Sequence, residues 1–556
     1  MAVYVQMILS GVIMKLVRFL CAAISLVALI VVSGISARAQ NSSPTERYLG
    51  IGAKQKPAAP LLAPQDLKDH VANGKLVLSL DDCIRLALSN NTDIHLDHNQ
   101  IDIAENNLHR VYGPFDPLLT SSFTDQRNKA PTSTQLSGAS ILNTLTQQTQ
   151  IGYAQTFQTG TNFQGSLVAT KSSTNSSFNT LNPSTTTALQ FFVTQPLLRN
   201  RGVFPNRAPI LIAQRNLKQA RASFVGEVSD IIQQIVGNYW NVVLAREVLV
   251  VQQKSLNEAQ KSYDHDNKAL SLGALPPLDI YRSESQVASR RVGVIQAEYA
   301  VKQAEDQFRQ SIAADIDPAT RVLDLDLTDR PEPVGELLNI DIATALARAI
   351  ANRPELEAAN QQLAIDELSV RLAHNNLKPD LEVSGFYLGN GLNGYQPGVA
   401  NTGIGTSLSQ SFRFVFPAYG ATLSLALPIK NHSAEANLAD ALVSRRHDQY
   451  QERETSQSIT LDVTSAVHAL EAAKLGMEAA KVAVDLAKET LHADERKYEL
   501  GTEQIFFVLD AQTQLAQAEL NLIQSQVSFQ VAVTQVDHAT GDLLEHHHVQ
   551  IVEPSK

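Results

Sequence analysis

The sequence is poor in cysteine and has no excess of basic residues. Among its 556 residues the only cysteines are Cys21 and Cys83, and Cys21 lies in a segment that we expect to be removed, so the exported chain can form no internal disulfide. Cys83 lies on an apolar helix face, which is typical of a small core residue. The formal net charge of −11 gives no basic footprint and disfavours nucleic-acid binding.

Long apolar runs are absent beyond the N-terminal region. Lys15 and Arg18 precede an apolar run over residues 19–32, and Ala37-Arg38-Ala39 offers a cleavage site with small residues at both ends. The run is shorter than the ~20 residues that a spanning helix needs, so we interpret residues 1–39 as an export signal rather than a membrane anchor. If the exported chain meets a membrane, strands must provide the contact.

Signatures of catalysis and of metal binding are missing as well. The sequence has no GxxxxGK phosphate loop, no GxSxG and no HExxH motif, so we expect neither an enzyme nor a cofactor. His546-His547-His548 has no cysteine or carboxylate cluster beside it, and His95 and His98 merely share a helix face, so no metal site is expected.

A seven-residue apolar repeat is the strongest pattern that the sequence does contain. Such a repeat puts an apolar seam on each helix and lets two helices coil around each other. A turn over residues 499–502 divides the repeat, which predicts a long antiparallel helical hairpin with Gly501 at its tip. The rungs are Val463, Leu470, Met477, Val484, Leu491 and Tyr498 before the turn, and Val508, Leu515, Leu522, Phe529 and Val536 after it.

The same pattern occurs 228 residues earlier, with Gly273 at the tip. Its rungs are Ile235, Val242, Leu249, Leu256, Tyr263 and Leu270, then Ile280, Val287, Val294, Val301 and Phe308. An ordinary buried helix face explains either ladder alone, but two ladders in register indicate an internal duplication. Residues 80–119 also match residues 342–381, at an offset of 262, so the first copy carries about 34 extra residues, which we place in a surface loop or an extra hairpin.

Between the helical parts, polar and apolar residues alternate with a period near two. In the first copy, residues 150–157 and 162–170 flank Gly160 as a predicted hairpin, and residues 188–197 are another strand candidate. In the second copy the expected strands are residues 381–388, 411–416 and 421–427. Such alternation is typical of transmembrane barrel strands, although a soluble β patch or Ser/Thr-rich linkers also fit it.

These patterns divide the chain into six segments and predict a mainly α fold with a β portion. The first repeat begins near a capping box over residues 79–82, and its first helix should end at Gly113-Pro114. The segments are an export signal (1–39), an extended lead-in (40–76), repeat 1 of helix, strands and long hairpin (77–315), a linker (316–338), repeat 2 (339–543) and a tail (544–556).

Together these segments resemble the TolC family of outer-membrane efflux proteins. The residues that carry the resemblance are segment 80–91, its echo 345–356, the run 195–199, and the tips Leu272-Gly273 and Leu500-Gly501. The resemblance covers essentially the whole chain after the export signal. It implies a homotrimer in which long coiled-coil hairpins form a periplasmic α-barrel, and four strands per chain close a twelve-stranded β-barrel in outer-membrane lipid.

The implied function is the exit duct of a tripartite efflux or type I secretion system, gated at its periplasmic tip. The implied partners are an inner-membrane pump and a periplasmic adaptor (membrane fusion protein), which would dock at the tip residues Leu272, Gly273, Leu500 and Gly501. Two alternatives stay open, namely a periplasmic adaptor and a coiled-coil scaffold without channel activity. Two hairpins and a cleavable signal argue against the adaptor.

The resemblance also assigns gate residues. Tyr498 matches a gate tyrosine, Asp279 matches its aspartate partner, and Asp510 matches one of the acids that ring the constriction. Phe507 and Glu503 depart from the pattern, because a second ring aspartate and a gate arginine are usual there. With one ring acid per chain we expect weaker cation selectivity than the family pattern gives. A packing role for Tyr498 and a solvated helix charge at Asp510 are the alternatives.

Overall fold

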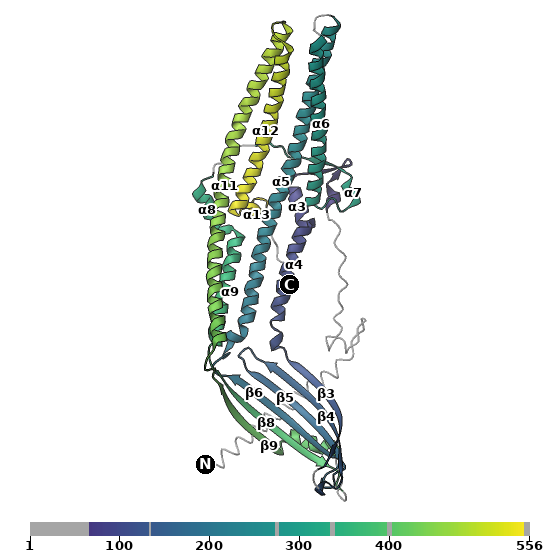
Figure 1. Cartoon of the computed structure of the whole chain (residues 1–556), viewed down its shortest axis with the longest axis vertical. Coiled ribbons are helices and arrows are strands. Elements are labelled where there is room, and N and C mark those ends of the chain that lie inside the picture. The colour runs from purple at the N-terminus through teal and green to yellow at the C-terminus, as the bar shows by residue number, and fades with distance from the viewer. Residues whose placement is uncertain (1–65, 133–134, 273–276, 334–339, 397–402, 550–556) are drawn as a thin grey trace. The chain divides into compact units, whose positions relative to one another are not determined.

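The computed structural model describes residues 66–549, apart from 133–134, 273–276, 334–339 and 397–402. The predicted export signal, most of the predicted lead-in and the tip residue Gly273 therefore lie outside the described residues. Within these limits the chain consists mainly of long helices and one larger antiparallel sheet (Figure 1).

Two long helical hairpins contain most of the helical residues (Figure 1). Helix α5 (Val203–Ser271) packs against α6 (Pro277–Ser311), and α11 (His432–Glu499) packs against α12 (Ile505–Thr540). The two predicted hairpins are therefore confirmed. Rungs of the predicted ladders that are buried include Ile235, Val242, Val294 and Phe308 in the first hairpin, and Val463, Leu470, Met477, Val484, Val508, Phe529 and Val536 in the second. None of the helices in the described ranges is both long and apolar enough to cross a membrane.

The two members of each hairpin differ in length. Helix α5 has 69 residues and α6 has 35, and α11 has 68 residues and α12 has 36. Shorter helices cover other parts of the long ones. Helix α4 (Thr92–Arg110) packs on α5, and α9 (Pro354–Asn376) packs on both α5 and α11. Each long helix therefore changes partner along its length.

The first helix of each predicted repeat is broken into two. The predicted capping box is confirmed, because the Ser79 side chain accepts from Asp82 N and the Asp82 side chain accepts from Ser79 N. The predicted single helix up to Gly113 is wrong, however, because α3 (Leu80–Asn90) ends at Asn91, whose side chain caps α4. In the second repeat, α8 (Ile342–Asn352) ends before Pro354, which begins α9.

The larger sheet has six antiparallel strands in the order β3-β4-β5-β6-β8-β9. The strands are β3 (Leu118–Pro131), β4 (Ile141–Thr156), β5 (Asn162–Thr174), β6 (Ser184–Pro196), β8 (Asp380–Gly394) and β9 (Phe416–Ala426). The predicted hairpin around Gly160 is confirmed as β4–β5. The predicted strand over residues 411–416 is wrong, because α10 (Gly403–Phe412) occupies most of it and β9 begins only at Phe416.

The strand number departs from the four per chain that the resemblance implies. The first predicted repeat contributes four strands to the sheet and the second predicted repeat contributes two, so the surplus residues of the first form a paired hairpin rather than a loop. The extra strands, β3 and β4, are long, and every residue of β3 from Leu118 to Pro131 pairs with a residue of β4. Backbone pairing of this extent explains why they join the sheet.

The two faces of the six-stranded sheet differ in polarity. The strand register places the odd-numbered residues of all six strands on one face, which we call the apolar face, and the even-numbered residues on the other, the polar face. The polar face is rich in Ser, Thr, Gln and Asn. Exposed residues of the apolar face include Leu119, Phe123, Ile151, Tyr153, Val193, Tyr387, Tyr419, Leu423 and Leu425.

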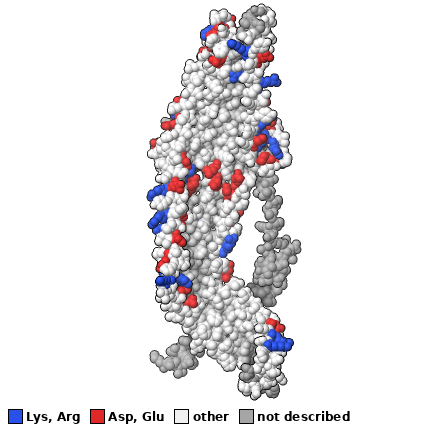
Figure 2. Space-filling view, viewed as in Figure 1, with Lys and Arg blue, Asp and Glu red and all other residues white. Residues whose placement is uncertain are grey.

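Charged residues in this sheet are confined to its two ends. On the face seen in Figure 2, charged side chains lie mostly over the helices, and the sheet is nearly free of them apart from one group at its far end. In sequence terms, the charged strand residues are Asp125, Arg127, Lys129 and Lys171 toward one end, and Asp380 and Glu382 toward the other. The middle of the sheet is uncharged.

A smaller sheet connects the predicted lead-in with the predicted linker. Strand β2 (Lys75–Leu78) pairs with β1 (Val71–Ala72) and runs parallel to β7 (Asp324–Leu327). Its apolar side chains join the main core cluster beside Tyr239 and Phe308. The short elements are η1 (Leu67–His70), η2 (Gly113–Phe115), η3 (Gln135–Ser137), α7 (Pro318–Arg321) and α13 (Leu543–His546).

Candidate functional site at the hairpin tips

Gly501 shapes the described tip of the second hairpin. Its φ of +73° is a left-handed conformation that glycine adopts readily because it has no side chain. Its N–H donates to Tyr498 O at 2.9 Å. The turn leaves Leu500 65% exposed, and at the other tip Leu272 is 83% exposed. Two of the four predicted docking residues are therefore apolar side chains in solvent.

Tyr498 contacts a buried carboxylate of the first hairpin. Its hydroxyl donates to Asp266 Oδ1 at 2.9 Å, and Ser283 Oγ donates to Asp266 Oδ2. The His265 ring lies edge-on to Tyr498, with the ring centroids 5.6 Å apart. Asp266 is 0% exposed. One carboxylate thus accepts hydrogen bonds from α6 and α11 while it belongs to α5, and it joins the two hairpins near their tips.

The sequence contains a signal for Asp266, although this residue is not a rung of the predicted ladder. Asp266 lies three residues after the rung Tyr263 and four before the rung Leu270, which is the second apolar position of the heptad. An ionisable residue at that position needs a partner, because a buried charge without hydrogen bonds is costly. Its partner is 232 residues away, so sequence spacing alone does not identify it.

The other two predicted gate residues are not described as part of this cluster. The side chain of Asp279, on α6, lies outside the described residues. Asp510 is exposed on α12, where it accepts a hydrogen bond from Gln514 Nε2 at 2.7 Å. Glu503, at the position where the resemblance leads us to expect a gate arginine, lies 3.0 Å from Lys497 within the same tip.

Further polar contacts join the two hairpins away from Tyr498. Lys254 Nζ lies 2.7 Å from Glu519 Oε1, and Arg290 Nη2 donates to Thr513 Oγ1 at 2.5 Å. Both contacts link the first hairpin to α12 and both are exposed to solvent. Exposed pairs of this kind contribute little each, about 0–1 kcal/mol, so the buried Asp266 contact is the stronger constraint.

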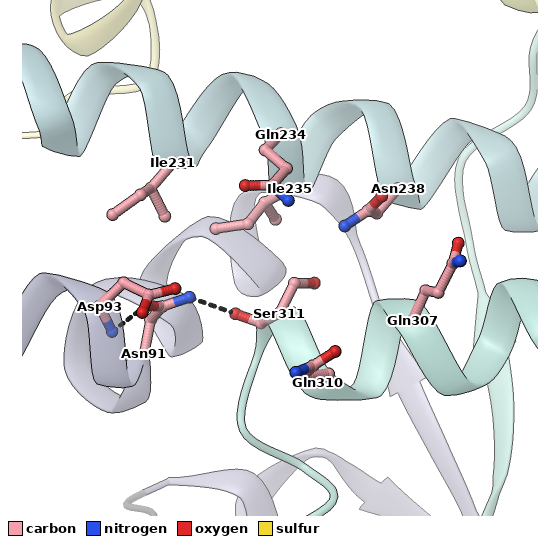
Figure 3. A pocket seen from close by; sticks show the side chains of 9 residues that line it. All are labelled: Asn91, Asp93, Ile231, Gln234, Ile235, Asn238, Gln307, Gln310 and Ser311. Carbon is pink, nitrogen blue, oxygen red and sulfur yellow. Dashed lines mark hydrogen bonds between the residues drawn. The ribbon is translucent and has the colours of Figure 1, made fainter.

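A polar pocket of about 400 Å³ lies where the N-terminal helices meet α5 and α6 (Figure 3). Asn91 is fixed in its wall, because its Nδ2 donates to Ser311 O at 2.9 Å and its Oδ1 accepts from Asp93 N at 2.8 Å. The lining residues are Asn91, Asp93, Ile231, Gln234, Ile235, Asn238, Gln307, Gln310 and Ser311. Amides dominate this lining, so it offers hydrogen bonds but no nucleophile with a base beside it.

A pair of carboxyl groups lies between α9 and α11. Gln362 Nε2 donates to Asp448 Oδ2 at 3.1 Å and lies 3.5 Å from Asp366 Oδ1. Burial, together with the neighbouring Asp448, raises the pKa of Asp366 to about 6. The hydrogen bond from His447 lowers the pKa of Asp448. This pair therefore holds a proton that an ordinary aspartate has lost at the same pH.

The described residues contain no group of three or more His, Cys, Asp or Glu side chains arranged to hold a metal ion. His546, in the predicted tail, pairs instead with Asp537 at 2.9 Å.

The comparisons with known proteins identify the family. The family model described as Outer membrane efflux protein matches residues 162–314 and 345–542, which is more than half of the chain. The chain therefore belongs to the outer membrane efflux protein family. Its members are outer-membrane channel proteins and not enzymes, which agrees with the expectation from the sequence.

Outer membrane protein TolC of Escherichia coli (strain K12) is 24% identical to this chain over 317 residues, which cover 55% of this chain and 60% of TolC. The match thus spans about three fifths of that relative's length. Similar folds occur in the outer-membrane channel OprN (TM-score 0.62, 16% identity, covering 83% of this chain and 90% of that one). VceC of Vibrio cholerae is also similar (TM-score 0.59, 15% identity, covering 83% and 96%).

Proposed function

We propose that this protein is the outer-membrane exit duct of a tripartite efflux or type I secretion system. The observation that carries the proposal is the six-stranded sheet, whose apolar face is exposed and whose middle is uncharged, in one chain with two long coiled-coil hairpins. An exposed apolar surface of this extent is normally in contact with a partner or a membrane. Because the chain belongs to a family of outer-membrane proteins, we infer that lipid contacts this face.

The edges of the sheet support assembly into a homotrimer. Strands β3 and β9 are the edge strands, and the sheet alternates in direction from one to the other. Hence β9 of one copy can pair antiparallel with β3 of the next, and pairing is required because open edges are not tolerated in lipid. Three copies with six strands each close an eighteen-stranded barrel, wider than the twelve strands of the resemblance.

The repeated element order supports the internal duplication and its domain limits. Two short helices, strands and a long hairpin occur in that order twice, as α3–α6 and as α8–α12. We keep the boundaries 77–315 and 339–543 for the two repeats. Residues 1–39 remain a proposed export signal.

We place the adaptor at the tips Leu272, Gly273, Leu500 and Gly501, and the pump beyond it. The exposed leucines Leu272 and Leu500 support this placement, because they offer apolar contact next to backbone that a partner can approach closely. The substrate stays open, since efflux of small molecules and secretion of proteins use the same duct.

We assign the gate to the Tyr498–Asp266–Ser283 contact, and Asp279 stays a proposed partner of Tyr498. In the closed state this contact holds the two hairpins together, and opening separates Tyr498 from Asp266. A partner that binds the separated tips better shifts the population toward the open state. Asp510 remains the proposed selectivity residue.

Reconstitution tests the proposal. The full-length protein is expressed, the outer membrane is separated from the inner membrane and periplasm, and the purified protein is added to planar bilayers. We expect an outer-membrane trimer that conducts ions. A water-soluble monomer without conductance would reject the exit duct in favour of a periplasmic adaptor or scaffold.

A further inference from the structure

Helix α10 packs on the apolar face of the larger sheet, above β6 and β8. Thr187 Oγ1 lies 2.6 Å from Ser411 Oγ, and Ser411 Oγ donates to Thr187 O at 3.1 Å. The approach is close because two glycines lie below the helix. A Cβ on Gly389 would lie 2.3 Å from Ser411 O, and a Cβ on Gly391 would lie 2.0 Å from Ser407 O.

The polarity of α10 is inverted relative to a helix on a water-soluble protein. Ser407 and Ser411, which face the sheet, are 0% exposed, whereas Ile404 is 52% and Phe412 50% exposed. Leu408 lies one turn from each of the two, so the outward side is an apolar ridge. Residues 403–412 contain no charge. A helix in water buries its apolar stripe, and a helix in lipid turns small and hydroxyl residues inward.

Helix α10 also accepts hydrogen bonds from β8 beyond the end of β9. The last pair of the β8–β9 ladder is Asn390 with Phe416. Beyond it, Leu392 N donates to Gln410 Oε1 at 2.9 Å, and Asn393 Nδ2 donates to Gly403 O at 2.6 Å. An unpaired strand N–H costs little in water, where it bonds to solvent, but is strongly unfavourable in hydrocarbon, so this arrangement suits a lipid environment.

The opposite side of the same strands is the polar face, which is rich in Ser, Thr, Gln and Asn. Such a surface suits a water-filled interior. The helix therefore lies on the side of the sheet away from this interior.

We propose that α10 is a lipid-embedded helix on the outside of the barrel, with Ile404, Leu408 and Phe412 in contact with acyl chains. It covers the ends of β6 and β8 that lie farther from the helical hairpins. The inference rests on the proposed function, because it takes the apolar face of the sheet to be the lipid-facing one. The occupant of the ridge is the membrane itself, not a protein partner.

Fluorescence quenching tests whether α10 lies in lipid. The background variant is Cys83→Ala; Cys83 is buried, and it is the cysteine that the described residues contain. Ile404→Cys, Leu408→Cys and Phe412→Cys are each labelled with a fluorophore in the reconstituted full-length protein. Quenching by brominated lipid is compared with quenching by aqueous iodide. Leu423→Cys, on the apolar face of β9, is the lipid control, and Thr422→Cys, on its polar face, is the aqueous control.

We expect the three α10 labels to behave like the label at residue 423, with several-fold stronger quenching by brominated lipid than at residue 422. Labels on α10 that respond to iodide like residue 422 would make α10 a plug of the interior and overturn the inference. Labels that respond to neither would place α10 against a second copy and also overturn it. If the label at residue 423 itself fails to respond to lipid, the proposed membrane sheet is rejected together with the inference.

Discussion

Asp266 is the side chain on which the contact between the hairpin tips depends. A carboxylate with no exposure is stable only where hydrogen bonds replace the water that it loses. Tyr498 and Ser283 provide two such bonds from two other helices. Separation of the hairpins therefore costs more here than at the solvent-exposed Lys254–Glu519 pair.

Replacing Tyr498 by Phe should destabilise the closed state. A hydrogen bond to a charged group contributes about 1.5–3 kcal/mol, which corresponds to a roughly 10- to 100-fold shift toward open channels. The measurement is the open probability of single channels in planar bilayers. Tyr419→Phe, on the sheet, is the control that should leave it unchanged. An unchanged open probability in Tyr498→Phe would remove this contact from the gate.

Removing the Asp510 carboxylate should lower cation selectivity modestly, because only one such acid per chain is expected at the constriction. The measurement is the reversal potential under a salt gradient, for the wild type, Asp510→Ala and the control Asp440→Ala. Asp440 is an exposed acid on another helix, α11. A change in Asp440→Ala alone, or no change in either variant, would contradict the assignment.

The Asp366–Asp448 pair should make stability depend on pH. The folded chain keeps the Asp366 proton up to a pKa of about 6, above the ordinary value of 3.8, so this contribution to stability is complete below pH ~4 and is lost as the pH rises through ~6. Asp366→Asn should abolish the loss, which is at most about 3 kcal/mol. Thermal unfolding in detergent between pH 4 and 8 measures the loss of stability in the wild type and in Asp366→Asn. The same pH dependence of the melting temperature in both proteins would refute the prediction.

The sequence identified one of the three members of the tip contact. The family resemblance assigns Tyr498 to the gate, and the structure puts it in a contact between the hairpins. Asp266 occupies an apolar position of the heptad, which marks it as unusual, but its partner depends on how α5 and α11 are packed, which no local pattern encodes. Ser283 gave no signal, since a serine on a helix is usually exposed.

At the scale of elements, Asn91 ends one helix and begins another. Its Oδ1 caps Asp93 N and Ile94 N, and its Nδ2 holds Ser311 O. The apolar spacing favours one continuous helix here, but Asn91, Thr92 and Asp93 are weak helix formers, and the side-chain cap together with the tertiary contact to α6 ends the first helix. In the second repeat Pro354 achieves the same break by steric means.

Asn91→Ala should therefore cost about 1–2 kcal/mol of stability, because it removes the cap and leaves Ser311 O without this donor. Asn106→Ala, at an exposed position of α4, should cost much less. Thermal unfolding of the purified protein compares the two variants. Equal melting temperatures would show that the break is set by the rest of the fold.

The heptad ladders predicted the hairpins well, because a seven-residue period has one structural meaning over many turns. Residues 411–416 misled because Ser411, Arg413 and Val415 interleave with three phenylalanines, which imitates strand alternation. What decides their structure is the close approach of Ser407 and Ser411 to Gly389 and Gly391. That fit exists only once β8 is in place.

At the scale of the whole molecule, the strand number sets the width of the proposed barrel. Composition and alternation predicted the β portion, but a barrel strand gives a weak signal, so the sequence left open whether the surplus residues were a loop or a hairpin. Pairing along the whole of β3 decides for the hairpin.

Deleting residues 118–158 should give a trimer with four strands per chain. Strands β3 and β5 both pair antiparallel with β4, so they run in the same direction and begin at the same end of the sheet, where Leu118 lies beside Ala154 and Ala154 beside Gln164. The chain that entered β3 can therefore enter β5 instead without reversing any remaining strand. Residues 159–161 then bridge the gap of about 10 Å between next-neighbour strands. Electron microscopy of the wild type and the variant should count eighteen and twelve strands.

A wild-type barrel of twelve strands would contradict the closure proposed here, either as a dimer or as a trimer with β3 and β4 detached. If the variant fails to assemble, the strand count of the wild type decides the matter alone.

The unequal lengths of the paired helices have a mechanical consequence. Helices α5 and α11 are paired with α6 and α12 over about half their length, and α4 and α9 hold the rest. In the proposed channel we therefore expect each long helix to bend where its partners change, so that the tips can separate while the ends next to the sheet stay in place.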